Sequence, residues 1–177
     1  AKQASKVVAP IAETAIATSD STKLNALKST LGAFAYSATL PSAKEQITTL
    51  ENNLLRIQIS NKGGYITEAV LKNQERFKKG SGELVTLIRN NNSQLNMSLK
   101  TQDNRLLQTQ DMFFEPSLTK SGDDQILTLR LKTAADAYLE YRYVLKPNNY
   151  MLDSDVRSQG LSKVLNTSQP LDLQWNM

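Results

Sequence analysis

The sequence predicts an all-β fold made of antiparallel strands, and three observations lead to this prediction. Apolar residues occupy every second position through most of residues 125–157, which is the period of a strand with one buried face. The breaks between these runs are short, so successive strands can only be antiparallel neighbours. Turn-forming residues fill the breaks, as in Lys146-Pro147-Asn148-Asn149.

The strongest pattern is a three-stranded meander over residues 125–157. The apolar faces of its strands are Leu127, Leu129 and Leu131; then Ala137, Leu139, Tyr141, Tyr143 and Leu145; then Tyr150, Leu152 and Val156. Ser154 breaks the third run, where a bulky apolar residue is expected. A buried hydroxyl without a partner costs about 1–3 kcal/mol, so we expect a twist or an exposed position at Ser154.

A β-hairpin is predicted at residues 55–72. Its first strand alternates apolar and polar residues, and Asn61-Lys62-Gly63-Gly64 supplies the positive φ angles of a tight turn. Gly63 and Gly64 are interpreted as a structural turn rather than as a phosphate-binding loop, because no helical pattern follows them. The sequence therefore assigns no ligand to this turn.

Further strands are predicted at residues 84–88 and 95–99, with a hairpin turn at Asn90-Asn91-Asn92. A turn at residues 121–124 leads into the meander, and a last strand follows from the alternation of Leu171, Leu173 and Trp175. Val164 and Leu165 are interpreted as the start of one more strand.

Residues 1–45 differ from the rest of the chain, because they are rich in Ala, Ser, Thr and Lys. Such a segment buries little apolar surface, so the first expectation is a flexible tether ahead of a β domain at 46–177. The alternative is a short helix at 21–36 that packs on the sheet or on a partner. Asp20 and Ser21 are suitable N-caps, and Leu24, Leu27, Leu31 and Phe34 follow at helical spacing.

The composition excludes several classes of enzyme. The chain has no cysteine and no histidine, which removes thiol nucleophiles, Ser-His-Asp chemistry and the usual zinc ligands. The carboxylate pairs Asp153/Asp155 and Asp123/Asp124 are interpreted as solvated strand and turn residues. We therefore expect no catalytic residue, no metal and no cofactor. A net charge of +4 without an aromatic-basic block gives no support for nucleic-acid binding.

Two segments together resemble a known family. Residues 50–64, followed by Ile66 and Val70-Leu71-Lys72, are similar to the opening of the periplasmic domain of YidC-type membrane protein insertases. The Ala-rich stretch ahead of them resembles the tether that joins this domain to the first membrane helix, in Bacteroidetes-like sequences in particular. The segment from Tyr141 to Tyr150 is similar to a later strand-turn-Tyr motif of that family. The resemblance covers about residues 48–175, and it presents the chain as a fragment truncated within the domain.

This resemblance implies a twisted two-layer antiparallel β-sandwich on the periplasmic face of the bacterial inner membrane, anchored by spans outside the chain. It also implies an accessory, non-catalytic role in membrane protein insertion, with Sec translocon subunits and nascent membrane proteins as partners. The insertion machinery of the family lies in its membrane helices, so no insertion residue is carried over. We expect a monomer.

Two other functions are considered. A carbohydrate-binding or adhesin-like sandwich would stack an exposed aromatic on a sugar ring, whereas this chain has a single tryptophan. A mutarotase-like enzyme would need acid-base histidines, which are absent. As candidate partner-contact residues we name Phe113, Phe114, Arg130 and Arg142, of which the two phenylalanines belong to an apolar knot at 112–114 that is also a candidate core segment.

Overall fold

The computed structural model describes residues 11–90 and 92–177, with side chains from residue 21 onward. The helices are α1 (Ile11–Leu31), the 3-10 turn η1 (Gly32–Phe34), α2 (Ala35–Ala38) and the 3-10 turn η2 (Thr109–Asp111). The strands are β1 (Ile47–Glu51), β2 (Leu55–Ser60), β3 (Ile66–Glu75), β4 (Leu84–Ile88), β5 (Gln94–Lys100), β6 (Leu106–Gln108), β7 (Glu115–Ser121), β8 (Asp124–Lys132), β9 (Tyr138–Leu145), β10 (Leu152–Gln159) and β11 (Asp172–Asn176).

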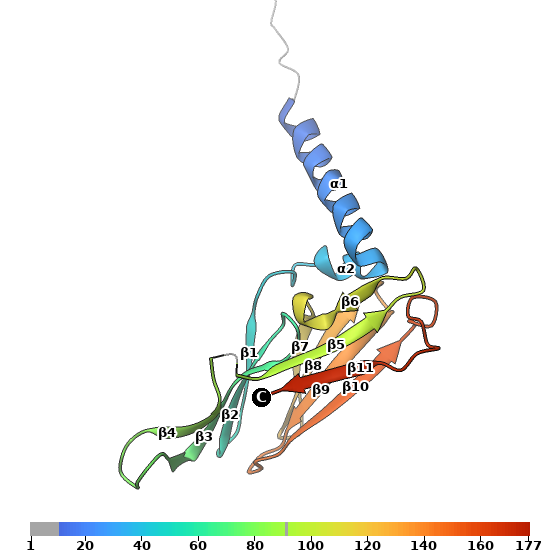
Figure 1. The fold of residues 1–177 in the computed structure, drawn as a ribbon. Helices are drawn as coiled ribbons and strands as arrows, with labels where there is room; N and C mark the ends of the chain where they lie inside the picture. Colours follow the sequence, from blue (N-terminus) through green and yellow to red (C-terminus); the bar gives the residue numbers. More distant parts are fainter. Residues whose placement is uncertain (1–10, 91) are drawn as a thin grey trace, which may run out of the picture.

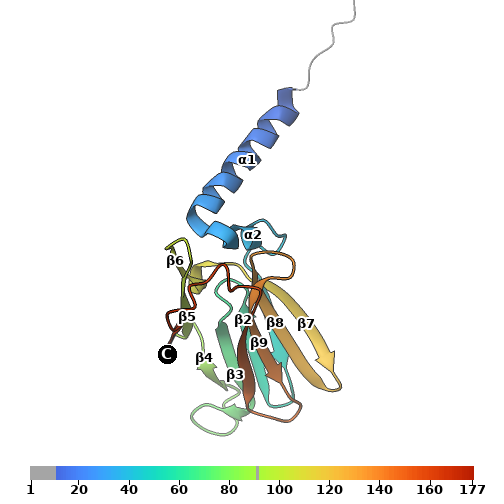
Figure 2. The same cartoon turned by 90° about the vertical axis from the view of Figure 1, so that its right-hand side faces the viewer.

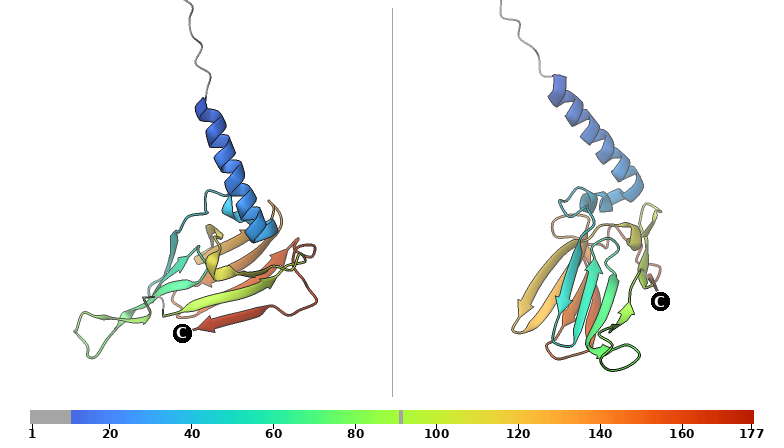
Figure 3. Two further views of the ribbon diagram at one scale, coloured as in Figure 1. Left: turned by 45° about the horizontal axis from the view of Figure 1, so that its top comes forward. Right: turned by 90° about the vertical axis from the view of Figure 1, so that its left-hand side faces the viewer.

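The strands form three antiparallel sheets. Their orders are β1-β2-β3-β4, β10-β9-β8-β7 and β11-β5-β6. Figure 1 and the left view of Figure 3 show β5 and β11 stacked in front of β8 and β9, as in a sandwich. This arrangement confirms the all-β, sandwich-like prediction.

The core lies where the apolar faces of the three sheets meet. In the predicted meander, Leu127 pairs with Tyr143, Leu129 with Tyr141 and Leu131 with Leu139. These six side chains are buried in one cluster that also contains Leu50, Leu55, Ile57, Ile59, Met97, Leu99, Leu107 and Phe114. The alternation in the sequence therefore identified the inward face of β8 and β9 correctly.

The N-terminal helix is longer than the helix that capping predicts. α1 begins at Ile11, so Asp20 and Ser21 lie inside it rather than at its N-cap. It ends where Gly32 adopts a φ of 58°, which favours glycine. Phe34 is fully buried in the core and Leu31 packs against it, which anchors the end of α1 to the sandwich. Figure 2 shows the rest of α1 standing clear of the sheets. Residues 1–10 of the expected tether lie outside the described residues.

Two strand predictions were wrong: one pair of strands is connected differently, and one further strand does not form. Residues 84–88 and 95–99 are strands, but they do not form a hairpin: β4 pairs with β3, whereas β5 pairs with β11 and β6. The asparagine segment therefore carries the chain from one sheet to another, and its Asn91 lies outside the described residues. Leu165 makes only an isolated bridge with Thr101, so no strand starts there.

The structure also contains a strand that the sequence pattern does not reveal. β7 lies at the edge of its sheet and pairs with β8 from Glu115↔Arg130 to Ser121↔Asp124. Most of its side chains are exposed, so its sequence shows no apolar alternation. Across the described part of the chain, no helix has the length and apolar character that a bilayer span requires.

Candidate functional site: a cleft between two sheet edges

Two strands that end their sheets, β10 and β11, leave part of the inner face uncovered. Within the described residues each has one hydrogen-bonded neighbour, β9 for β10 and β5 for β11. Val156 lies opposite Tyr141, and Leu173 lies opposite Met97, so both share the face of a buried core residue. Nevertheless Val156, Leu173 and Trp175 are 45, 49 and 58% exposed.

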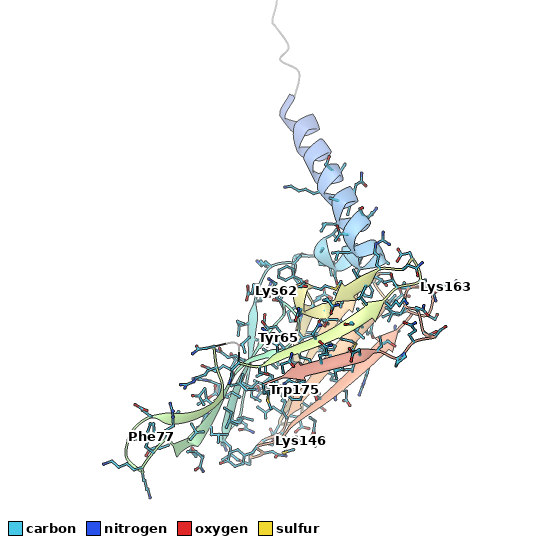
Figure 4. All side chains as sticks on the ribbon, in the orientation of Figure 1. Lys62, Tyr65, Phe77, Lys146, Lys163 and Trp175 are labelled. Atoms are coloured by element: carbon cyan, nitrogen blue, oxygen red, sulfur yellow. The ribbon has the colours of Figure 1, made fainter. Side chains whose placement is uncertain are left out.

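These side chains border a cleft of about 170 Å³. Its lining is Tyr65, Ile66, Ser93, Leu95, Tyr141, Tyr143, Leu152, Ser154, Asp155, Val156, Leu173 and Trp175. The lining is mainly apolar, and most of its members come from β5, β9, β10 and β11. Figure 4 shows Trp175 on β11 and Tyr65 beside the same region of the sandwich. A cleft of this kind suits an apolar ligand or side chain.

The polar groups in the floor of the cleft are already paired. The Tyr143 hydroxyl donates to the carbonyl oxygen of Gly64 at 2.7 Å, and the Tyr141 hydroxyl donates to Thr109 Oγ1 at 3.1 Å. Burial raises the pKa of both tyrosines above the ordinary value of 10. Both therefore stay protonated at neutral pH, and their hydroxyls act as structural donors.

The cleft explains the break in the third strand of the meander. Ser154 pairs with Tyr143 and lies on the inward face, but it is exposed and lines the cleft. Its hydroxyl therefore stays accessible to water and pays no burial cost. The local exposure that the sequence analysis offered as one alternative is confirmed.

The four predicted contact residues do not come together in one surface. Phe114 is fully buried and stacks on Tyr141 with 4.8 Å between ring centroids, so its prediction as a surface residue was wrong and its core alternative is correct. Phe113 is half-buried and lines a groove with Leu27 and Leu31 of α1. The other two, Arg130 and Arg142, lie on β8 and β9.

Both arginines are engaged in ion pairs. Arg130 Nε lies 2.7 Å from Glu140 Oε2, and this hydrogen bond raises the pKa of the guanidinium. Glu140 is only 5% exposed, so the arginine compensates a buried carboxylate. Arg142 pairs with Asp155 at 3.4 Å. Sequence patterns place these residues on the outward face of the meander but do not show the pairing.

Of the carboxylates singled out in the sequence, the pair on β10, Asp153 and Asp155, serves in ion pairs. Asp153 lies 3.0 Å from Lys146 Nζ, and Asp155 contacts Arg142 and Arg157. Among the described residues, no three His, Cys, Asp or Glu side chains are grouped so that they could hold a metal ion.

The backbone of the turn explains why positions 63 and 64 are both glycine. Their φ angles are 78° and 70°. A Cβ on Gly64 would lie 2.6 Å from a ring carbon of Tyr141, so the turn packs directly on the meander. Asn61 before it is buried, and its side chain bonds the main chain at Ser42, Lys44 and Gln46. The sequence indicated the turn but not this network.

The cleft itself was not predicted, although its residues carried a signal. Leu171, Leu173 and Trp175 predict a strand with one apolar face, and Val156 predicts the same for β10. What the sequence does not reveal is that β10 and β11 end their sheets on the same side of the sandwich. Their inward side chains therefore border an opening instead of a closed core.

The fold and the cleft together define an all-β, sandwich-like domain preceded by a helix, with an apolar opening between two edge strands. Comparison with known proteins assigns this domain to a family. Residues 47–176 match the family described as the YidC periplasmic domain.

Curated relatives agree with this match. The chain is 34% identical over 157 residues to a membrane protein insertase YidC of Parabacteroides distasonis, covering 88% of this chain and 24% of the relative. It is 34% identical over 166 residues to the YidC of Porphyromonas gingivalis strain ATCC 33277, covering 93% and 25%. For the YidC of Bacteroides fragilis strain ATCC 25285 the values are 32% over 142 residues, covering 80% and 22%.

The chain belongs to the YidC periplasmic domain family, and it spans about a quarter of the length of these relatives. The resemblance noted in the sequence is confirmed, as is the periplasmic location that the family description carries.

Proposed function

We propose that this domain is an accessory part of a membrane protein insertase, which aids the insertion and folding of membrane proteins through protein contacts and has no catalytic activity. The observation that carries the proposal is the family match over residues 47–176. The partners we propose are nascent membrane proteins and subunits of the Sec translocon. The domain acts as a monomer, anchored by membrane spans elsewhere in the full-length protein.

The cleft between β10 and β11 supports a role in protein contact. An extended segment of a client can pair its main chain with a free strand edge and place apolar side chains between Val156 and Leu173. Burial of the exposed apolar surface of these residues and of Trp175 against such a segment would stabilise the complex by roughly 25 cal/mol per Å² of apolar area.

The experiment that tests the proposal changes the cleft in the full-length protein. The double variant Val156→Asp, Leu173→Asp places two charges in the opening. Both positions are about half exposed, so the fold is expected to persist. Insertion of membrane proteins and photo-crosslinking from position 154 to nascent chains are measured. We expect both to fall several-fold.

The matched control is Leu118→Asp, because Leu118 is also half exposed on an edge strand, β7, but does not line the cleft. We expect this variant to insert membrane proteins at the normal rate. Full activity and full crosslinking in the double variant would refute a role for the cleft in client contact.

One observation favours a carbohydrate-binding function as a second candidate. The single tryptophan, Trp175, is 58% exposed at the cleft, and its Nε1 donates to Ser93 Oγ at 3.1 Å, which fixes the ring. Sugar sites use such a ring, but they also need several polar groups around it. The polar lining here is limited mainly to Ser93, Ser154 and Asp155. Calorimetry with cell-wall sugars that shows micromolar binding, lost in Trp175→Ala, would support this function instead.

A further inference from the structure

The hairpin of β3 and β4 carries an exposed aromatic ring at its tip. Figure 1 shows this hairpin projecting from the sandwich at the end away from α1, and Figure 4 labels Phe77 in its loop. Phe77 is 87% exposed, more than the other large apolar side chains described. The ring therefore contributes almost nothing to the core.

The backbone of this loop presents the ring in a defined direction. Phe77 has a φ of 64°, and the Lys78 N–H donates to the Arg76 carbonyl oxygen at 2.8 Å, which closes a three-residue turn around it. The Arg76 N–H donates to the Glu83 carbonyl at 2.7 Å, and Ser81 Oγ donates to the Arg76 carbonyl at 2.9 Å. A loop held in this way loses little conformational entropy on binding.

The residue type at position 77 is unfavourable for folding alone. A positive φ suits glycine or asparagine and strains a bulky side chain. The ring buries little surface in return. Backbone strain of this kind is concentrated at functional sites.

The charges around the ring indicate the chemistry of the partner. Arg76, Lys78 and Lys79 surround Phe77, and the Arg76 guanidinium lies 4.9 Å from the ring centroid. Glu75 and Glu83 flank the loop, so three basic residues face two acidic ones. This excess is small beside the four to eight basic residues typical of segments that bind anionic membranes. A protein with a local acidic rim fits the charge better than a bilayer.

We propose that the tip at residues 76–79 docks on a protein partner by inserting Phe77 into an apolar pocket whose rim carries carboxylates. An aromatic anchor ringed by charge is a common form of binding hot spot. The inference rests on the proposed function in protein contact, but it assigns that contact to a surface other than the cleft. The tip and the cleft share no lining residue.

The test uses photo-crosslinking in cells with the full-length protein and a benzoylphenylalanine at position 77, followed by sequencing of the crosslinked peptides. We expect adducts with a protein peptide that contains apolar and acidic residues. The triple variant Arg76→Glu, Lys78→Glu, Lys79→Glu should reduce the adduct at least fivefold. Adducts with lipid alone, with a peptide that lacks acidic residues, or at a yield equal to that of the same probe at Leu118 would overturn the proposal.

A second variant separates binding from folding. Phe77→Asn removes the ring and suits the positive φ, so the melting temperature should stay equal or rise while co-purification of the crosslinked partner falls at least tenfold. Unchanged co-purification would overturn the proposal. A probe at position 154 in the same protein reports on the cleft. Without any other substitution, a probe at position 154 that gives no crosslink while the probe at 77 does contradicts the proposed function of the cleft, and the reverse result contradicts this inference.

Discussion

The hydroxyl of Tyr143 donates a 2.7 Å hydrogen bond to the carbonyl oxygen of Gly64, and this bond ties the meander to the first hairpin of the opposite sheet. Next to it, the ring of Tyr141 packs so close to Gly64 that a methyl group would not fit between them. The two tyrosines of β9 thus hold together sheets that share no strand.

Tyr143→Phe should lower the free energy of unfolding by about 1–3 kcal/mol at neutral pH, because the buried Gly64 carbonyl loses its donor. Burial raises the pKa of Tyr143 above its ordinary value of 10. The stability that this residue contributes is therefore complete below pH 10 and is lost as the pH rises further. Urea unfolding from pH 8 to pH 11 should show a shallower alkaline loss in the variant than in the natural protein.

The control for this measurement is Tyr138→Phe, because the Tyr138 hydroxyl makes an exposed bond to Gln159. It should change neither the neutral stability nor the alkaline slope by much. Equal slopes in all three proteins would show that Tyr143 does not govern the alkaline loss.

Gly64→Ala should destabilise the fold by about 3 kcal/mol or more, because it adds the strain of a positive φ to a clash with Tyr141. Gly82→Ala is the matched variant: its φ is 73°, and apart from the adjacent residues no described atom lies within 4 Å of the added methyl group. It should cost only the backbone strain of about 1 kcal/mol. Equilibrium unfolding of both variants measures the difference, and similar losses would contradict close packing at Gly64.

Asn61→Ala should lower the free energy of unfolding by about 3 kcal/mol. The Asn61 side chain accepts from the Gln46 N–H at 2.7 Å and donates to the carbonyls of Ser42 and Lys44 at 2.8 and 2.9 Å, and its loss leaves several main-chain groups without partners. Asn53→Ala, which removes an exposed bond to Asn148, should cost less than about 0.5 kcal/mol. A loss at Asn61 as small as that at Asn53 would disprove the network.

Arg130→Ala should destabilise the fold by about 1–3 kcal/mol, because it leaves the buried Glu140 carboxylate without its cation. Asp155→Ala removes an exposed partner of Arg142 and should stay within about 0.5 kcal/mol of the natural protein. Thermal unfolding at neutral pH distinguishes the two. Equal melting temperatures would mean that water, rather than Arg130, compensates Glu140.

The sequence predicted the strands in which apolar and polar residues alternate, and in β8 and β9 this alternation follows from burial of one face. β8 and β9 alternate because Leu129 and Tyr141 face the core while Arg130 and Arg142 do not. β7 was missed because its edge position leaves Leu118 and Lys120 exposed, so no alternation is required. The hairpin expected at residues 84–99 failed because strand pairing is set by long-range packing, which periodicity does not encode.

The candidate site was harder to predict because it depends on how sheets are arranged. Nothing local distinguishes Val156 or Leu173 from core residues: both alternate correctly and both lie on inward faces. Their exposure follows from the position of β10 and β11 at the ends of two different sheets. Ser154 was the one local sign, because a small polar residue interrupts an apolar run there.

The pairing of Leu173 in β11 with Met97 in β5 has a consequence for the order of folding. β7 to β10 join neighbours in the chain, so their loops close at little entropic cost and the meander can form early. The β5-β11 ladder instead joins segments that are far apart in the sequence, so the long intervening chain must first be brought into place. We therefore expect hydrogen exchange after refolding to protect the amides of β8 and β9 first and those of β11 last.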